Sequence, residues 1–92
     1  MKLDLQYEQN CIFANDESGK RIAEITFPAV SEKVVDIDHT FVDPSLRGQG
    51  AADLLMRAAV SDIEKKGLKT RTSCPYAAKW FLKHTEFSDL LE

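Results

Sequence analysis

The sequence predicts an α+β fold in which a mixed, mostly antiparallel sheet is covered by two helices, in the chain order β-β-β-β-α-β-α. Residues 2–42 alternate between apolar and polar side chains in short runs that turn residues separate, which is the pattern of half-buried strands. Residues 50–66 instead repeat their apolar side chains at the spacing of a helix. A short β-prone segment and a second helix, which begins at a proline, complete the order.

Four strands are expected before the first helix. Lys2 to Tyr7, Cys11 to Ala14 and Ile22 to Phe27 are short and are joined by turns, which favours an antiparallel meander. Lys33 to Val42 is predicted to be a fourth, longer strand. Because successive strand side chains point to opposite faces, one face of this strand carries Val35, Ile37, His39 and Phe41.

The first helix is predicted from about Gly50 to Lys66, with an apolar stripe that faces the sheet. The stripe consists of Ala52, Leu55, Met56, Ala59 and Ile63. Leu68 to Ser73 is the fifth strand, and the second helix runs from Pro75 to about His84. Because a helix connects them, the fourth and fifth strands are expected to form a locally parallel pair.

The composition is that of one domain, residues 1–92, with a formal net charge of −3 spread evenly along the chain. The lack of a basic block argues against a nucleic-acid partner. Without a run long enough to span a membrane or a recognisable leader, we expect a cytoplasmic protein. We expect a monomer because the sequence indicates no long unpaired apolar surface. Cys11 and Cys74 are then expected to be reduced, and no Cys or His cluster has the spacing of a metal site.

The loop between the fourth strand and the first helix carries the strongest functional signal. It reads Val42-Asp43-Pro44-Ser45-Leu46-Arg47-Gly48-Gln49-Gly50-Ala51-Ala52. A helix start has main-chain N–H groups without partners and a partial positive charge, and glycines let an anion approach them closely. Arg47 adds a permanent cation that matches phosphate oxygens. The loop therefore predicts a pyrophosphate site, although a tight strand–helix turn beside a solvated arginine would have the same composition.

Four motifs in this order resemble the GNAT superfamily of N-acetyltransferases, and more closely its compact Yjdj-type branch. They are His39-Thr40, Leu46-Arg47-Gly48-Gln49-Gly50, Cys74-Pro75-Tyr76 and His84-Thr85-Glu86-Phe87. The resemblance covers the chain from about residue 5 to residue 88. Thr85 and Phe87 depart from the branch, which has proline and tyrosine at these positions, so any role of that phenol is lost.

The resemblance implies acetyl-CoA as cosubstrate and an amine as the acceptor of its acetyl group. The pyrophosphate would lie on Arg47, Gly48, Gln49, Gly50, Ala51 and Ala52. The pantetheine arm would run along the end of the fourth strand and pair with it like an added strand, at Thr40, Phe41 and Val42. A main-chain N–H at that edge would also hold the thioester oxygen.

Cys74 and His39 are the candidate catalytic residues. Cys74 precedes the second helix, whose dipole favours a thiolate able to accept the acetyl group. His39 would be the base for this thiol or for the incoming amine. Each also has a structural explanation: Cys74 as a small buried residue at a helix cap, and His39 as a core histidine beside Ile37 and Phe41.

The resemblance also implies a missing general acid. Ordinary members of the superfamily use a tyrosine on the last helix to protonate the departing CoA thiolate. Phe81 aligns with that tyrosine and has no proton to give, which leaves Tyr76 as a substitute. Trp80 and Phe81 are most simply core residues.

We therefore expect an acetyl-CoA-dependent N-acetyltransferase. Only Glu8-Gln9-Asn10 joins the first two strands, where ordinary members have helices that wall the acceptor pocket. An exposed protein amine is therefore the favoured acceptor. Two alternatives stay open: a CoA-binding module that senses acyl-CoA or carries an acyl group without transfer, and an interaction domain whose loop binds nothing.

Overall fold

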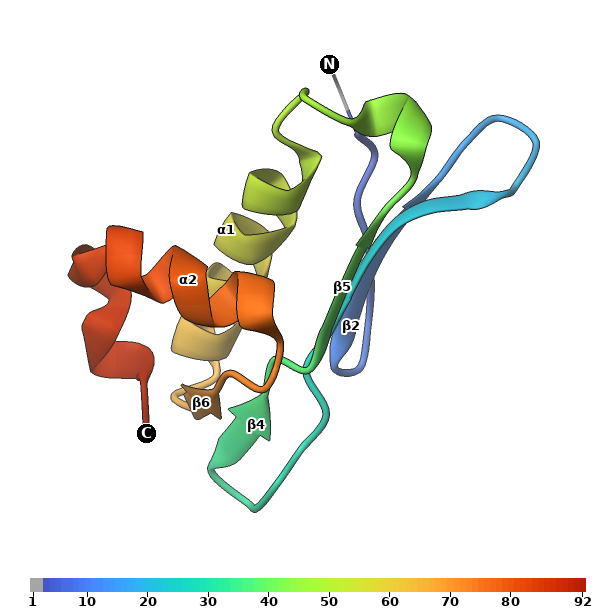
Figure 1. Cartoon of the computed structure of the whole chain (residues 1–92). Coiled ribbons are helices and arrows are strands. Elements are labelled where there is room, and N and C mark those ends of the chain that lie inside the picture. The colour runs from blue at the N-terminus through green and yellow to red at the C-terminus, as the bar shows by residue number, and fades with distance from the viewer. Residues whose placement is uncertain (1–2) are drawn as a thin grey trace.

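The computed structural model describes residues 3–92 and divides them between a four-stranded antiparallel sheet, a parallel strand pair and two α-helices (Figure 1). The antiparallel sheet has the order β1-β2-β3-β5, formed by Gln6–Glu8, Cys11–Asn15, Arg21–Thr26 and His39–Val42. The parallel pair joins β4 (Val34–Asp36) to β6 (Lys69–Arg71). The α+β class, the mostly antiparallel pairing and the parallel pair are confirmed.

The two predicted helices are present within one residue of their expected ends. They are α1 (Ala51–Lys65) and α2 (Pro75–Lys83). Two short 3-10 helices, η1 (Pro44–Leu46) and η2 (Thr85–Leu90), were not predicted, because segments this short leave no clear period in a sequence. In the part of the chain that the structure describes, no helix is long and apolar enough to cross a membrane.

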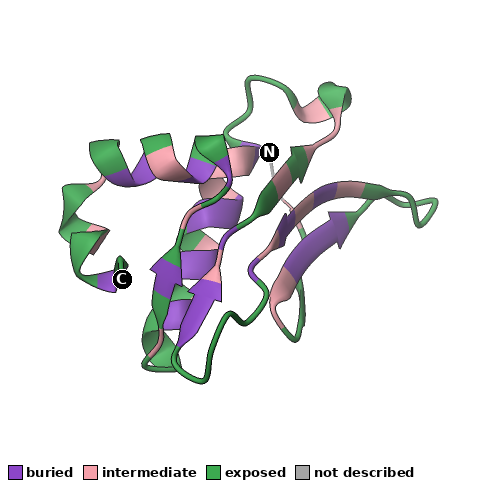
Figure 2. Ribbon diagram, turned by 60° about the horizontal axis from the view of Figure 1, so that its bottom comes forward, coloured by how far each residue is buried: buried purple, intermediate pink, exposed green. Residues whose placement is uncertain are grey.

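The core lies between α1 and the face of the sheet that α1 covers. Buried residues follow the sheet-facing side of α1, as Figure 2 shows in purple. From α1 the core receives Ala51, Leu55, Met56, Ala59, Val60 and Ile63. The predicted stripe is thus confirmed except at its first position, because Ala52 is only half-buried and lines a cavity.

The first strand begins later than predicted. Lys2 lies outside the described residues, and Leu3 and Leu5 pack as half-buried side chains against the core without pairing as a strand. β1 starts at Gln6, where the register with β2 begins. Their apolar alternation therefore reflects packing beside the sheet and not membership of it.

The segment predicted as one long strand, 33–42, consists of two strands, of which only the first, β4, pairs with β6. After β4, the Ile37 amide still donates to the Arg71 carbonyl on the β6 side (3.0 Å), whereas the Asp38 amide donates to the Thr26 carbonyl on β3 (3.3 Å). From there β5 runs antiparallel to β3. The other edge of the segment is paired throughout, because the Asp36 amide donates to the Pro28 carbonyl (2.9 Å) and Ala29 bridges Val35.

The faces of the segment reverse at Asp38 and His39, because both residues lie opposite Thr26, as in a β-bulge. Val35 and Ile37 are buried, as predicted, but His39 and Phe41 are exposed on the other side of the sheet. A slip of one residue in a strand moves every later side chain to the opposite face. The prediction that these four residues share a face is therefore wrong.

Asp53 holds α2 against the start of α1. Its carboxylate accepts hydrogen bonds from the Trp80 indole N–H and from the Arg57 Nε, each at 2.8 Å. Trp80 is buried and stacks on His84, with 4.0 Å between the ring centroids, while the Phe81 ring meets it edge-on. The hydrogen bond from Trp80, followed by that from Arg57, holds the pKa of Asp53 below its usual range.

We expect Asp53→Ala to lower the free energy of unfolding by about 1–3 kcal/mol, because the buried Trp80 N–H loses its acceptor. Asp53→Asn keeps an acceptor and loses only the charge. Because the folded pKa is depressed, the contribution of the charge is complete above the unfolded pKa of about 3.9 and is lost as the pH falls through the folded value. In urea unfolding, the gap between the natural chain and Asp53→Asn should hold down to about pH 5 and close in acid. A gap that persists in strong acid contradicts this role.

Candidate functional site

The first turn of α1 offers main-chain donors that the protein leaves unused. The first hydrogen bond of the helix runs from the Leu54 amide to the Gly50 carbonyl (3.0 Å). Within residues 3–92, the amides of Gly48, Gly50, Ala51 and Ala52 have no acceptor. The whole entry to the helix is exposed, as the green loop at the top of Figure 2 shows. These donors meet the requirement for binding an anion at a helix start.

The backbone conformation at Gly48 and Gly50 favours glycine over other residues. Both have φ near +79°, a left-handed conformation that side chains with a Cβ rarely adopt. A Cβ at either position would meet no atom within 4 Å, so the space beside these two residues is open. The open space belongs to a cavity of about 250 Å³, whose wall includes the two glycines, Arg47 and Val42. Arg47 forms no ion pair with the residues that the structure describes.

Gln49 does not contribute a free donor to this loop. Its amide donates to the Leu46 carbonyl (3.2 Å), and its side chain donates to the Ser45 carbonyl (3.2 Å). The Arg47 amide is likewise used, by the Pro44 carbonyl (3.1 Å). The predicted set of pyrophosphate donors is therefore narrower than expected: Arg47 offers its side chain, and Gln49 stabilises the turn.

β5 is an edge strand with one open side. The Asp43 amide donates to the Ile22 carbonyl (2.8 Å), and hydrogen-bonded pairs alternate along an antiparallel ladder, so Phe41 turns its main chain toward β3. Thr40 and Val42 therefore point their N–H and C=O groups to the open side. Of the three residues predicted to pair with a pantetheine arm, Thr40 and Val42 are available and Phe41 is not.

Cys74 is buried where α2 begins. Its amide donates to the Ile37 carbonyl (3.1 Å), and its Sγ lies 3.6 Å from the Thr40 Oγ1. Burial alone would raise the pKa of the thiol, but the main-chain N–H of Ala77, the Thr40 hydroxyl and the N–H of Tyr76 hold the pKa below its ordinary value. The sulfur makes no full capping hydrogen bond, so these amides act as nearby partial charges.

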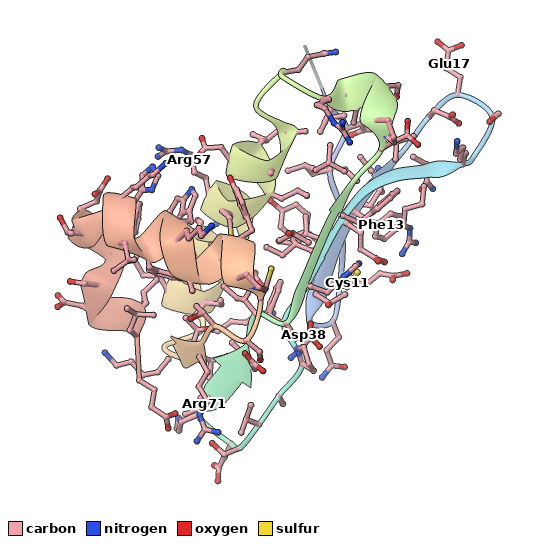
Figure 3. All side chains as sticks on the ribbon, viewed as in Figure 1. Cys11, Phe13, Glu17, Asp38, Arg57 and Arg71 are labelled. Carbon is pink, nitrogen blue, oxygen red and sulfur yellow. The ribbon has the colours of Figure 1, made fainter. Side chains whose placement is uncertain are left out.

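His39 does not lie beside Cys74. It points to the outer face of the sheet, its side chain is 53% exposed, and its Nε2 is 3.8 Å from the Glu24 Oε1. The next residue, Thr40, points inward and makes the contact with Cys74 instead. Neither the expected pairing with the thiol nor the expected core position fits this arrangement, because the strand reverses its faces after Ile37. Figure 3 shows Cys11 and Phe13 on this same outer side, away from the helices.

Tyr76 has the right place and protonation to donate a proton. Its side chain lines the cavity at the start of α1. Burial, followed by the negative charges of Asp53 and Cys74, raises the pKa of the phenol, so it stays protonated at neutral pH. Phe81 is buried in the core and Trp80 packs beside it, as predicted for both.

A second cavity adjoins the first along α2. It has a volume of about 280 Å³ and is lined by Asp53, Tyr76, Lys79, Trp80, Lys83 and His84. Because the two cavities share Asp53 and Tyr76, they form neighbouring parts of one groove. No group of His, Cys, Asp or Glu side chains among residues 3–92 gathers as a metal site requires.

Sequence reasoning missed two contributors to the site. Asp53 joins α1 to α2 beside the groove through its hydrogen bond with Trp80. The sequence feature that could have identified it is an acidic residue in the first helical turn, four positions before Arg57. The Thr40 hydroxyl contacts the thiol of Cys74. The sequence feature that could have identified it is the His39-Thr40 pair, of which the second residue, and not the first, faces Cys74.

Comparison with known proteins places these features in a family. A family model described as GCN5-related N-acetyl-transferase matches residues 11–90. Protein NATD1 of Danio rerio is 33% identical over 89 residues, which cover 97% of this chain and 78% of that protein. Protein NATD1 of Xenopus tropicalis is 33% identical over 70 residues, and the match spans 76% of this chain but only 63% of the length of the frog protein.

Solved structures agree. An NMR structure of a GCN5-like protein from Staphylococcus aureus superposes with a TM-score of 0.81 at 30% identity, covering 98% of this chain and 88% of the other. Ard1 from Thermoplasma volcanium shares the fold, with a TM-score of 0.64 at 19% identity over 82% of this chain and 53% of the other. With the unused donors at the start of α1 and the open edge of β5, these matches show that the chain belongs to the GCN5-related N-acetyltransferase family.

Proposed function

We propose that this chain is an N-acetyltransferase that binds acetyl-CoA in the groove between β5, the start of α1 and α2. One observation carries the proposal: unused main-chain donors continue from the start of α1 to the edge of β5 and lead to a thiol. Val42 lies in the cavity beside the free amides, and Thr40, two residues back on the same edge, contacts Cys74. A pyrophosphate would bind the amides of Gly48, Gly50, Ala51 and Ala52, with Arg47 as its counter-charge.

The edge of β5 fits the amide-bearing arm of the coenzyme. Thr40 and Val42 offer one N–H and one C=O each on the open side, which is the pattern that an added strand pairs with. An arm that starts at the pyrophosphate and follows this edge reaches the Sγ of Cys74 at its end. The main-chain N–H of Thr40 is then a donor for the thioester oxygen, because it faces the same side.

Cys74 is the proposed nucleophile. Its thiolate attacks the acetyl carbonyl carbon, a new S–C bond forms, and the bond to the CoA sulfur breaks. The departing thiolate takes a proton from Tyr76, whose raised pKa keeps the phenol protonated until that point. An amine then attacks the acyl-cysteine, loses a proton to solvent or to the Tyr76 phenolate, and releases the Cys74 thiolate.

The acceptor is proposed to be an amine on a protein. β1 and β2 are joined by Gln9 and Asn10 alone, so no helix is inserted there to enclose a small metabolite. His39 lies on the outer face beside Glu24, away from Cys74, so it is not proposed as a base for the thiol or for the amine.

A second function is favoured by one specific feature. Phe81 is buried where ordinary members have their general acid, so a chain that binds acetyl-CoA, or carries the acetyl group on Cys74, without onward transfer is the competing possibility. The two functions differ in whether an amine receives the acetyl group.

Arg47→Ala should weaken acetyl-CoA binding by about 10- to 150-fold, the loss of about 1.5–3 kcal/mol that a charged hydrogen bond contributes. Calorimetric titration measures the affinity, and thermal unfolding checks that the domain stays folded. Lys33→Ala removes an equal charge from an exposed site outside the groove and should leave the affinity unchanged. Equal affinities of the natural chain and Arg47→Ala would rule out the pyrophosphate site.

The two thiols should titrate differently. The alkylation rate of Cys74, followed in Cys11→Ser, should reach half its maximum at a lower pH than that of Cys11 in Cys74→Ser, because burial and Glu24 raise the pKa of Cys11. Thr40→Val should move the midpoint of Cys74 upward, since the thiolate loses a donor. Thr26→Val is the matched control, because its hydroxyl contacts Asp38. Identical midpoints for the two cysteines would contradict this environment.

Covalent transfer has a direct test. After incubation with acetyl-CoA, intact mass spectrometry should show one added acetyl group that persists in Cys11→Ala and is absent in Cys74→Ala. Addition of a peptide with a free amine should discharge the adduct. An adduct that no amine discharges supports the carrier, and full turnover in Cys74→Ala eliminates the acyl-cysteine.

A further inference from the structure

Apart from Tyr76, the residues that line the second cavity have no part in the acetyl transfer described above. It lies along α2 and is reached from the first cavity past Asp53 and Tyr76. The coenzyme arm leaves the first cavity in another direction, past Val42 along β5. The other half of the molecule, which is joined to the same pyrophosphate, therefore needs separate space, and this cavity is the adjoining volume.

The cavity wall carries two cations without partners. Lys79 and Lys83 are one helical turn apart on α2, a spacing at which like charges repel each other. Neither forms an ion pair within residues 3–92, and unlike Lys33 and Lys65, which have none either, both line this cavity. Two unpaired ammonium groups on one wall favour an anion with more than one charge, such as a phosphomonoester at neutral pH.

The one carboxylate in the wall is already neutralised. Both oxygens of Asp53 accept hydrogen bonds, one from the Trp80 indole and one from Arg57, and the His84 Nε2 lies 3.9 Å away. Figure 3 shows Arg57 reaching from α1 toward α2, where its guanidinium carbon lies 5.9 Å from the Trp80 ring centre. The electrostatic potential in the cavity is therefore positive and is determined by the lysines. A positive potential also disfavours a cationic amine acceptor there.

We propose that this cavity binds the phosphomonoester on the ribose of the coenzyme's nucleotide half, with Lys79 and Lys83 as its ligands. This rests on the proposed function, because it assumes that the pyrophosphate lies at the start of α1. The chain then binds three phosphoryl groups. Main-chain amides and Arg47 bind two of them, and side chains of α2 bind the third. The lysines determine selectivity for coenzymes that carry the third phosphate.

The test compares CoA with 3′-dephospho-CoA, which lacks only that phosphate, by calorimetric titration of the intact chain at moderate salt. The natural chain should bind CoA about tenfold or more tightly than the dephospho form. The double variant Lys79→Gln/Lys83→Gln should lose that preference through weaker binding of CoA alone. The control Lys33→Gln/Lys65→Gln removes the same number of charges outside both cavities and should keep the preference.

The outcomes separate this inference from the function beneath it. Equal affinity of the natural chain for both coenzymes, or an equal loss for both in Lys79→Gln/Lys83→Gln, overturns the nucleotide site and leaves the acetyl-CoA groove in place. Saturable binding of neither coenzyme overturns the groove itself. A loss of preference in the Lys33→Gln/Lys65→Gln control would show that net charge, and not this cavity, makes the distinction, and would also overturn the proposal.

Discussion

The groove depends on the point after Ile37, where the strand segment 34–42 parts from β6. Up to this point the segment is paired on both edges, with β6 and with residues 28–30, and beyond it only the pairing with β3 remains. Two strands that continued side by side would close the sheet, and β5 would then have no free N–H or C=O groups. Because they part, Thr40 and Val42 have an open edge, and the Ile37 carbonyl receives the Cys74 amide. The thiol, the edge and the start of α1 are thereby brought to one side of the sheet.

Charge is distributed unevenly around this groove, although the chain as a whole carries a formal charge of −3. Arg47, Lys79 and Lys83 line its two cavities without carboxylate partners among the described residues. The outer face of the sheet instead carries Glu24, paired with Arg21 and near His39. The unpaired cations of the described residues that line the groove therefore favour an anion on this side of the sheet.

Periodic patterns in the sequence identified most of the fold, and non-local contacts account for the rest. α1 and α2 could be located to within a residue because their apolar spacing, Pro75 and the flanking glycines are local signals. The division of 33–42 into two strands depends on the pairing of two residues with Thr26 and on β6, which follows more than twenty residues later. For the site, Gly48, Gly50 and Cys74 were recognisable by motif, whereas the partners of individual amides, such as that of Gln49, follow only from turn geometry.

The two-residue turn at Gln9–Asn10 has a kinetic consequence. Asn10 takes a positive φ and its side chain donates to the Phe27 carbonyl (2.8 Å), so the connection between β1 and β2 is short and anchored. Many enzymes close a mobile flap over their substrates and are slowed by its reopening. This hairpin leaves no length of chain to serve as such a flap, so in the proposed transferase an acceptor would pass it without waiting for this loop to move.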